Sequence, residues 1–358
     1  MRDMLNLIGR SLLFWLSIFE LLAGRRGWRG LSWLGHRFPH RLLAPLPPAA
    51  LLGARGSHRQ MAGSLALAAP LALAFQIAAS SLRNYALNPL LRLRPGRYDD
   101  RTIVGVGIPL REGYLPALHV IPRSGATMAI CILHGSGDHK TAYTWWLVDA
   151  LLAQGLAALL IDLDGHGENP RPQSFPAITE DVAAAVGWLR ARHERVGVLG
   201  ISMGGCVAAR AVADGVAVDA LAVLEAPPIL SYRRADVWRE ALALARPDLL
   251  DLFSDCTVYQ IVHTWSTAPI RATISTWDLI AALDLPGSLA RVTAPTLLLY
   301  GANDAIIKPA QAEQVRRAAP PGATFLLLPR TSHLTLILDP QVLREIGEWF
   351  ADVVKRKT

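Results

Sequence analysis

One short segment constrains the fold more than any other part of this sequence, and it reads GISMGG at residues 200–205. An apolar run typical of a buried strand precedes it, and a stretch with helical periodicity follows it. A serine between two such elements sits on a sharp turn that lifts its hydroxyl above the sheet edge. Gly200 and Gly204 suit this turn, because it brings neighbouring backbone very close. The segment therefore predicts Ser202 as a nucleophile beside a helix N-terminus.

Short apolar runs alternate with helical patterns from about residue 98 onward. Expected strands lie at residues 102–108, 115–121, 127–133, 156–161, 196–201, 220–224, 296–300 and 324–328, and expected helices at 142–153, 178–192, 203–213, 310–319 and 341–354. This alternation predicts parallel strands joined by crossover helices. Strands that are apolar throughout, such as ALLI at 158–161, fit a sheet covered on both faces.

Residues 227–289 interrupt the alternation between two expected strands. They are rich in helix formers and contain Trp238, Trp265 and Trp277. We interpret them as a helical cap over the strand ends, with a long helical connection as the alternative. The three tryptophans are expected to line an apolar substrate site.

Two glycine-rich segments resemble loops of the α/β-hydrolase superfamily. HGSGD at residues 134–138 and DLDGHGE at 162–168 each follow an expected strand. In that superfamily the loop after the third strand completes the oxyanion hole. The resemblance therefore implies that the main-chain N–H groups of Ser136 and Met203 are the two donors, and that His134 is structural.

The acid and the base are expected after the last two strands. Asp304 lies in the turn after residues 296–300 and matches the superfamily position of the triad acid, and Glu225, after the preceding strand, is the alternative acid. His333 follows the final strand and is the expected base. The order serine, acid, histidine is that of the α/β-hydrolases.

The resemblance covers residues 100–355 and implies an α/β-hydrolase fold with an eight-stranded, mostly parallel sheet. Helices are expected on both faces, in a catalytic domain at residues 98–358. The implied activity is hydrolysis of a small carboxylic ester or thioester through an acyl-serine intermediate. An acyltransferase with the same triad and a non-catalytic, membrane-tethered scaffold remain alternatives. No cofactor is expected, and the histidines lack the spacing of a metal site.

Residues 1–97 match no family and are predicted to be a basic, apolar helical extension. Residues 1–100 contain thirteen Arg, no Lys and four acidic residues, whereas the whole chain has a net charge of +7. The apolar stretch at 4–23 indicates a membrane-associated or packed helix, with a cleaved signal peptide as the alternative. The stretch at 61–80 indicates either a transmembrane helix or a helix packed on the catalytic domain. No nucleic-acid module is present. Three widely spaced cysteines fit a reducing, cytoplasmic compartment, and any membrane association is expected through residues 1–80.

Overall fold

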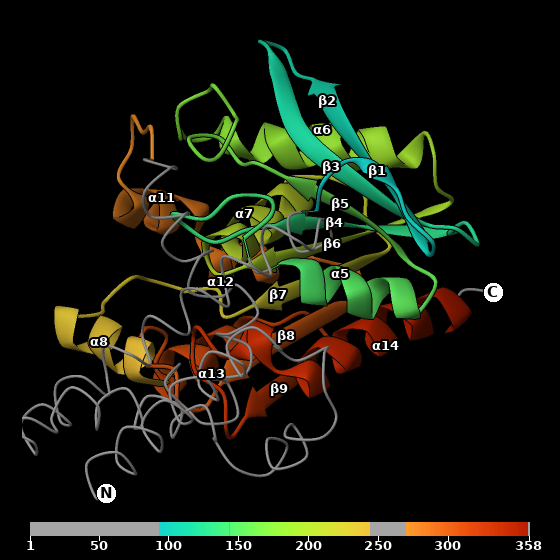
Figure 1. Ribbon diagram of the computed structural model, residues 1–358. Coiled ribbons are helices and arrows are strands. Elements are labelled where there is room, and N and C mark those ends of the chain that lie inside the picture. Colours follow the sequence, from blue (N-terminus) through green and yellow to red (C-terminus); the bar gives the residue numbers. More distant parts are fainter. Residues whose placement is uncertain (1–92, 143, 244–269, 357–358) are drawn as a thin grey trace, which may run out of the picture. The chain divides into compact units, whose positions relative to one another are not determined.

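The computed structural model describes residues 93–142, 144–243 and 270–356 of the chain (Figure 1). Nearly all of the predicted N-terminal extension, including the stretches at 4–23 and 61–80, lies outside these residues. Part of the predicted cap, with Trp265, lies outside them as well. Of the helices that are described, none combines the length and the apolar character needed to cross a bilayer.

Nine strands form one sheet in the order β1-β2-β3-β5-β4-β6-β7-β8-β9. The strands are β1 (Gly96–Arg97), β2 (Arg101–Pro109), β3 (Tyr114–Pro122), β4 (Met128–Leu133), β5 (Ala157–Ile161), β6 (Arg195–Ile201), β7 (Ala220–Leu224), β8 (Thr296–Gly301) and β9 (Thr324–Leu328). The predicted fold is confirmed, and β2 to β9 coincide with the eight expected strands. The sheet has one strand more than expected, because β1 is only two residues long and lacks an apolar pattern.

The sheet changes character between β3 and β5. Strands β1, β2 and β3 are antiparallel to their neighbours, whereas the pairs from β5 to β9 are all parallel. Strands β4, β5, β7 and β8 are buried along their whole length. Uniform burial requires cover on both faces of the sheet, which explains why these strands are apolar throughout.

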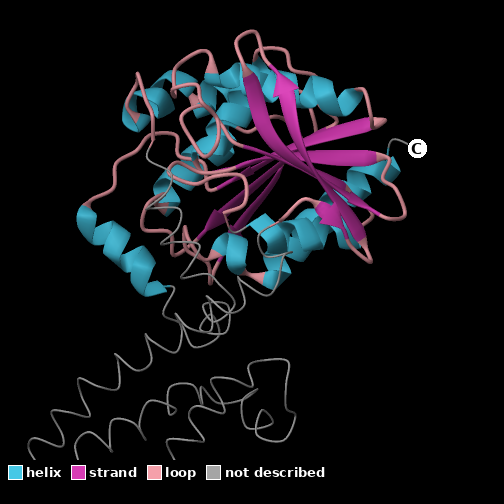
Figure 2. Cartoon of the chain, turned by 45° about the horizontal axis from the view of Figure 1, so that its top comes forward, coloured by secondary structure: helices cyan, strands magenta, loops and turns pink. Residues whose placement is uncertain are grey.

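Helices provide this cover on both sides of the sheet (Figure 2). They are α5 (Thr144–Ala153), α6 (Ile178–Arg190), α7 (Met203–Ala213), α8 (Arg234–Ala243), α11 (Thr276–Leu283), α12 (Leu285–Leu289), α13 (Pro309–Ala318) and α14 (Pro340–Arg356), with a 3₁₀ turn, η4 (Leu336–Leu338). One apolar cluster joins the sheet to α5 and α14, and the other joins it to α6, α7, α11, α12 and α13.

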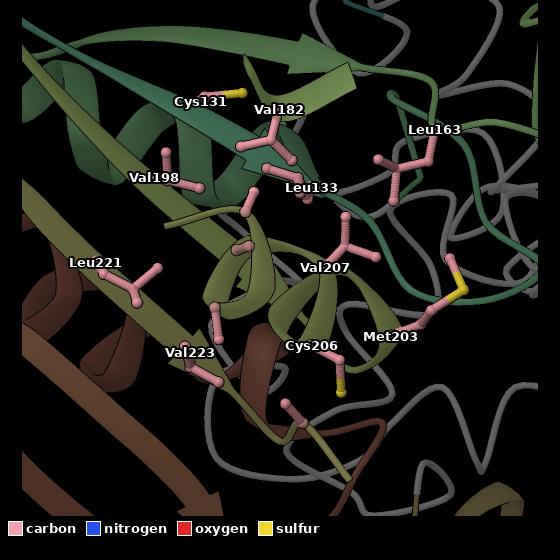
Figure 3. Packing of buried hydrophobic residues seen from close by; sticks show 14 of the residues in the cluster. Cys131, Leu133, Leu163, Val182, Val198, Met203, Cys206, Val207, Leu221 and Val223 are labelled. Atoms are coloured by element: carbon pink, nitrogen blue, oxygen red, sulfur yellow. The ribbon is translucent and has the colours of Figure 1, made fainter. Parts of the chain in front are cut away.

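Helix α7 is anchored in the second of these clusters. Its residues Cys206 and Val207 are fully buried against strand side chains such as Val198 and Val223, and Val182 of α6 completes the contact (Figure 3). Burial of side chains of this size contributes roughly 1.5–3 kcal/mol each. The helix that begins just after Ser202 is thus held rigidly on the sheet.

The register of the parallel strands brings several loops to one edge of the sheet. Ile201 at the end of β6 pairs with Leu224 at the end of β7, and Gly301 at the end of β8 pairs with Leu328 at the end of β9. The loops that follow β6, β7, β8 and β9 therefore emerge side by side. In open parallel sheets this carboxyl edge is where ligands bind.

Within the predicted cap, three helices are described. Helix α12 and the adjacent α11 contact α7 on the body of the fold, and Leu279, Ile280, Leu283, Leu285 and Leu289 join its core. The described end of the insertion is thus part of the catalytic domain's own core, and Thr276 and Trp277 at the start of α11 face the carboxyl edge.

Candidate active site

Ser202 lies on the tight turn between β6 and α7, where its backbone adopts φ 51° and ψ −119°. This region is strained for a residue with a side chain, and such strain is typical of a serine nucleophile at a strand–helix turn. The neighbouring backbone leaves no room for other side chains. A Cβ atom on Gly200 would lie 2.3 Å from the carbonyl oxygen of Gly204, and one on Gly204 would lie 2.5 Å from that of His134. Because these would be contacts with backbone atoms, which cannot move aside as a flexible side chain can, only glycine fits at both positions.

The loop after β4 runs directly beside Ser202, since a Cβ atom on Gly135 would lie 3.5 Å from the serine Cβ. The buried His134 ring holds this loop. Its Nε2 accepts a hydrogen bond from the N–H of Leu163 at 3.1 Å, and its Nδ1 donates to the carbonyl oxygen of Gly135 at 2.8 Å. Burial keeps the pKa of His134 well below its ordinary value. The neutral ring links the loops after β4 and β5, which is a structural role.

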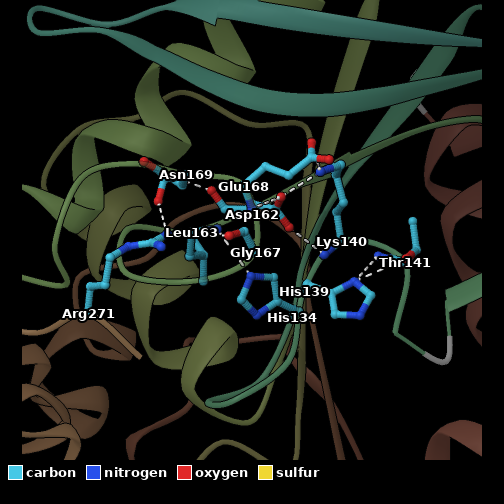
Figure 4. A network of polar contacts seen from close by, with 10 residues as sticks. All are labelled: His134, His139, Lys140, Thr141, Asp162, Leu163, Gly167, Glu168, Asn169 and Arg271. Atoms are coloured by element: carbon cyan, nitrogen blue, oxygen red, sulfur yellow. Dashed lines mark hydrogen bonds and ion pairs between the residues drawn. The ribbon is translucent and has the colours of Figure 1, made fainter. Parts of the chain in front are cut away.

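A buried ion pair joins the same two loops (Figure 4). The Nζ atom of Lys140 lies 2.5 Å from Oδ2 of Asp162 and 2.7 Å from Oε2 of Glu168. Asp162 also accepts hydrogen bonds from the main-chain N–H groups of Lys140 and Glu168, at 2.7 and 2.9 Å. Burial opposes the charge on Lys140, but the two carboxylates prevail and raise its pKa. This network fixes the loop segment 134–140 beside the serine.

Asp304 and His333 lie in the loops after β8 and β9, and they are in direct contact. The Nδ1 atom of His333 lies 2.9 Å from Oδ2 of Asp304. The other carboxylate oxygen, Oδ1, accepts hydrogen bonds from the N–H groups of Ile306 at 2.7 Å and Ile307 at 2.6 Å. Burial alone would lower the pKa of His333, but Asp304, Glu240 and Asp138 raise it above its ordinary value.

Ser202 and His333 line one cavity of about 510 Å³ at the carboxyl edge of the sheet. Among the hydrogen bonds of the described residues, none joins the Ser202 hydroxyl to the imidazole. The Nε2 atom is the ring nitrogen left after the contact between Nδ1 and Asp304. In enzymes without substrate the contact between nucleophile and base is often long and shortens when substrate binds.

The two residues predicted to form the oxyanion hole also line this cavity. Met203 is the first residue of α7, so its main-chain N–H has no acceptor within the helix. Ser136 is exposed, and its hydroxyl lies 3.3 Å from that of Thr276 at the start of α11. Donation of these N–H groups to a substrate oxygen remains a prediction.

Two acidic residues of the site carry roles that the sequence did not reveal. Glu240 of α8 is buried, and its carboxylate accepts hydrogen bonds from the N–H groups of Ala305 at 2.7 Å and Leu334 at 3.2 Å. It therefore ties the acid loop to the base loop. Asp138 lines the cavity, and burial raises its pKa to about 7. The HGSGD segment contained this residue, but only the folded loop places it in the wall of the cavity that Ser202 also lines.

The three tryptophans predicted to bind substrate have different positions. Trp277 lines the cavity and packs against Tyr232 in a tilted arrangement, with 5.0 Å between the ring centroids and 32° between the ring planes. Trp238 is 71% exposed and does not line the cavity, whereas its neighbour Val237 does. Trp265 lies outside the described residues. The cavity wall is otherwise mainly aliphatic, with Ile201, Pro227, Leu230, Val237, Ile270, Ile280, Ile306, Leu334, Ile337 and Leu338.

One cluster among the described residues has the donor atoms for a cation. Oxygens of Glu225 and Asp304 and a nitrogen of His333 lie within 4.8 Å of one another. Two of these atoms already bond each other, because Oδ2 of Asp304 and Nδ1 of His333 are 2.9 Å apart. The arrangement is thus that of an acid orienting an imidazole, and a cation there would have to displace this hydrogen bond.

The strained serine turn, the loop after β4 and the acid–imidazole pair at the carboxyl edge of a mostly parallel sheet define an α/β-hydrolase. The family model described as "Serine aminopeptidase, S33" matches residues 125–341. The chain therefore belongs to the serine aminopeptidase S33 family, in the broad sense that this model covers.

Two curated relatives match this chain at about a quarter identity. An uncharacterised protein of Mycobacterium tuberculosis is 25% identical over 312 residues, which span 76% of this chain and 86% of that protein. The pimeloyl-acyl-carrier-protein methyl ester esterase of Xylella fastidiosa is 26% identical over 238 residues, or 57% of this chain and 87% of the enzyme.

Two solved esterases share the architecture at low identity. The esterase EaEST of Exiguobacterium antarcticum has 18% identity and a TM-score of 0.54, over 70% of this chain and all of that one. The hyperthermophilic esterase of Pyrobaculum calidifontis has 17% identity and a TM-score of 0.52, over 78% and 91% of the two chains. At such identities the likeness establishes the fold alone.

Proposed function

We propose that this α/β-hydrolase cleaves a carboxylic ester or thioester with an apolar acyl group, through Ser202, His333 and Asp304. The observation that carries the proposal is the hydrogen bond of 2.9 Å between Asp304 and His333, in the wall of the cavity that also contains Ser202. The esterase activity named for the Xylella fastidiosa relative supports an ester as substrate.

The reaction begins at the Ser202 hydroxyl, which is a weak nucleophile until a base removes its proton. The Nε2 atom of His333 takes this proton while the serine oxygen attacks the carbonyl carbon. Asp304 keeps the remaining ring proton on Nδ1 and stabilises the imidazolium. The carbonyl oxygen becomes negative in the tetrahedral intermediate, and the N–H groups of Ser136 and Met203 are the donors available to it.

The intermediate collapses when the bond to the leaving group breaks. Nε2 of His333 returns its proton to the departing alcohol or thiol, which leaves an acyl group on Ser202. Water then attacks the acyl carbon and gives a proton to the same nitrogen. As the bond between the acyl carbon and the serine oxygen breaks, the imidazolium passes this proton to the serine oxygen, and the carboxylic acid is released. The aliphatic cavity wall favours an apolar acyl chain, because such a chain gains free energy when it leaves water.

Labelling with a fluorophosphonate probe tests the proposal directly. We expect the full-length protein to be labelled on Ser202 and to hydrolyse activated esters, with a preference that changes across acyl chains of graded length. Ser202→Ala is expected to remove both properties. Ser124→Ala, in an exposed turn, is the matched control and is expected to retain both. Labelling or turnover that survives in Ser202→Ala would refute the assignment of the nucleophile.

A further inference from the structure

Glu225 lies directly after β7, where the loops that carry the site emerge from the sheet. Its Oε2 is 3.9 Å from Nδ1 of His333, and its side chain is completely buried. Neither of its carboxyl oxygens makes a well-formed hydrogen bond among the described residues, although the main-chain N–H of Gly301 lies close enough to favour the charged form. Its backbone also adopts a positive φ of 49°, while its N–H donates to the carbonyl oxygen of Leu299.

These features make Glu225 costly for stability. A buried carboxyl without a well-formed hydrogen bond has lost most of the hydrogen bonding that it had in water, and a positive φ is strained for a residue with a side chain. Buried polar groups without partners are uncommon in native proteins, and catalytic use is one reason for their presence. Because Oε2 of Glu225 lies 3.9 Å from Nδ1 of His333, the imidazole is the group that Glu225 is placed to influence.

We propose that Glu225 is a second positioning acid for His333, able to hold the Nδ1–H of the imidazole in place of Asp304. The inference rests on the proposed function, in which His333 is the base. Asp304 makes the shorter contact, at 2.9 Å against 3.9 Å for Glu225, so a movement of roughly 1 Å would bring Glu225 to hydrogen-bond distance. No proton is transferred in this role, since either carboxylate only accepts the hydrogen bond from Nδ1–H.

The charge on Glu225 depends on its ionisable neighbours, which are His333, Asp304, Glu240 and Tyr300. Burial and the nearby carboxyl groups of Asp304 and Glu240 raise the pKa of Glu225 well above its ordinary value, which favours the neutral form of Glu225. Tyr300 is also buried and stays neutral, since its hydroxyl donates to the carbonyl oxygen of Ala226 at 2.8 Å. Removing the Asp304 charge favours ionisation of Glu225 and allows its carboxylate to accept the hydrogen bond from the Nδ1–H of His333.

The test compares four full-length proteins: the unchanged chain, Asp304→Asn, Glu225→Gln and the double variant. Asp304→Asn keeps an oxygen for the N–H groups of Ile306 and Ile307 but removes the charge next to His333. Where the triad acid acts alone, its change to Asn lowers kcat roughly 10⁴-fold. Here we expect a loss of about 10²-fold in Asp304→Asn, and about 10⁴-fold only in the double variant.

Two further readouts separate positioning from a structural effect. In Asp304→Asn, kcat/KM is expected to show a second rise with pH as Glu225 ionises, in addition to the rise caused by deprotonation of His333, and only this second rise is absent from the double variant. A low-field proton NMR signal from the Nδ1–H of His333 is expected in Asp304→Asn and not in the double variant. Thermal unfolding verifies that each variant folds. If Glu225→Gln does not fold, Glu225→Met replaces it in both the single and the double variant, because it also removes the carboxyl group. If Asp304→Asn does not fold, Asp304→Ala replaces it in the same comparisons.

Equal kcat/KM values and equal pH profiles for Asp304→Asn and the double variant would overturn the inference. That result is distinguishable from failure of the proposed function. If the proposed function fails, the unchanged chain itself shows neither fluorophosphonate labelling nor ester hydrolysis. If only the inference fails, the unchanged chain is active, and kcat/KM decreases to the same extent in Asp304→Asn and in the double variant. Loss of activity on chelation of divalent cations would also overturn the inference, because Glu225, Asp304 and His333 would then be ligands of a cation.

Discussion

The Nδ1 atom of His333 lies 2.9 Å from Oδ2 of Asp304, although 29 positions separate the two residues in the sequence. The loop of Asp304 holds the carboxylate from the other side, through the N–H groups of Ile306 and Ile307. The orientation of the imidazole is therefore set by the backbone after β8 and β9. This arrangement leaves Nε2 for the cavity that contains Ser202, and it makes the charges around the ring the main control on its basicity.

The first prediction concerns Asp138, whose pKa burial raises to about 7. His333 must be neutral to act as a base, so kcat/KM should rise with pH through its pKa, which lies above the ordinary value. The Asp138 carboxylate helps to raise that pKa, because a negative charge favours the imidazolium. Asp138→Asn should therefore shift the acidic limb of the kcat/KM profile to lower pH.

Alkaline pH gives a second readout of the same variant. Ionised Asp138 places a negative charge beside the site where the oxyanion forms, which opposes the transition state. We therefore expect Asp138→Asn to retain more of its maximal activity above about pH 8, where the original carboxyl is ionised. Steady-state kinetics on one ester between about pH 5 and 9 cover both limbs. Identical pH profiles of kcat/KM for the unchanged chain and Asp138→Asn would mean that the charge on Asp138 does not affect the reacting groups.

The strands and the serine turn could be predicted because their signals are local. Largely apolar runs of five to seven residues marked β2 to β9, and the expected helix at residues 203–213 coincides with α7 (Met203–Ala213). The turn at Ser202 needs small neighbours whatever surrounds it, so its glycines are visible in the sequence alone. The short β1 was missed because two partly exposed residues carry no pattern.

The residues contributed by α8 could not be predicted, for a physical reason. Successive residues of a helix point about 100° apart, so the side chain that faces a cavity depends on how the helix docks. Trp238 was expected to bind substrate, but the structure turns Val237 and Glu240 toward the cavity and leaves Trp238 exposed. The way the insertion docks depends on contacts between residues that are far apart in the sequence, and no sequence motif indicates these contacts.

The second prediction concerns Glu240, which bridges the loops of Asp304 and His333. Its carboxylate accepts N–H groups from Ala305 and Leu334, and Glu240→Gln replaces one acceptor oxygen with an NH₂ group that cannot accept. We expect a loss of about 1–3 kcal/mol in the free energy of unfolding. The kcat/KM value should fall as well, because the two loops lose their common anchor.

A matched control for Glu240 is the exposed Glu313 of α13. It pairs with Arg316 and Arg317 at the surface, and surface pairs contribute little to stability. Glu313→Gln should leave both chemical unfolding and kcat/KM nearly unchanged. Equal effects of the two substitutions would show that the bridge made by Glu240 does not support the site.

The third prediction uses the contrast between Trp277 and Trp238. Trp277 lines the cavity beside Tyr232, whereas Trp238 is 71% exposed. Trp277→Ala should lower kcat/KM for long acyl esters about tenfold or more, since apolar contacts in a binding pocket contribute roughly 1–3 kcal/mol. Short acyl esters should be affected less, and Trp238→Ala should change neither. A loss that is the same for every chain length would place Trp277 outside the acyl site.

The last prediction addresses the serine turn, through two glycines that differ only in their surroundings. A Cβ atom on Gly204 would lie 2.5 Å from the carbonyl oxygen of His134 and 2.6 Å from that of Leu133, both of them backbone atoms. Gly204→Ala must push α7 away from the loop after β4, at an expected cost of about 3 kcal/mol in the free energy of unfolding. A Cβ atom on Gly187, in the middle of α6, would meet nothing within 4 Å.

Gly187→Ala should therefore stabilise the protein by about 0.5–1 kcal/mol, because alanine restricts the unfolded chain and favours the helix. Chemical unfolding of both variants measures the difference in sign. Ester hydrolysis should be lost in Gly204→Ala even at temperatures where it remains folded, since displacement of the loop after β4 separates Ser136 from Ser202. A Gly204→Ala protein that hydrolyses esters at the original rate would show that close contact between the two loops is not what holds the serine in its reactive position.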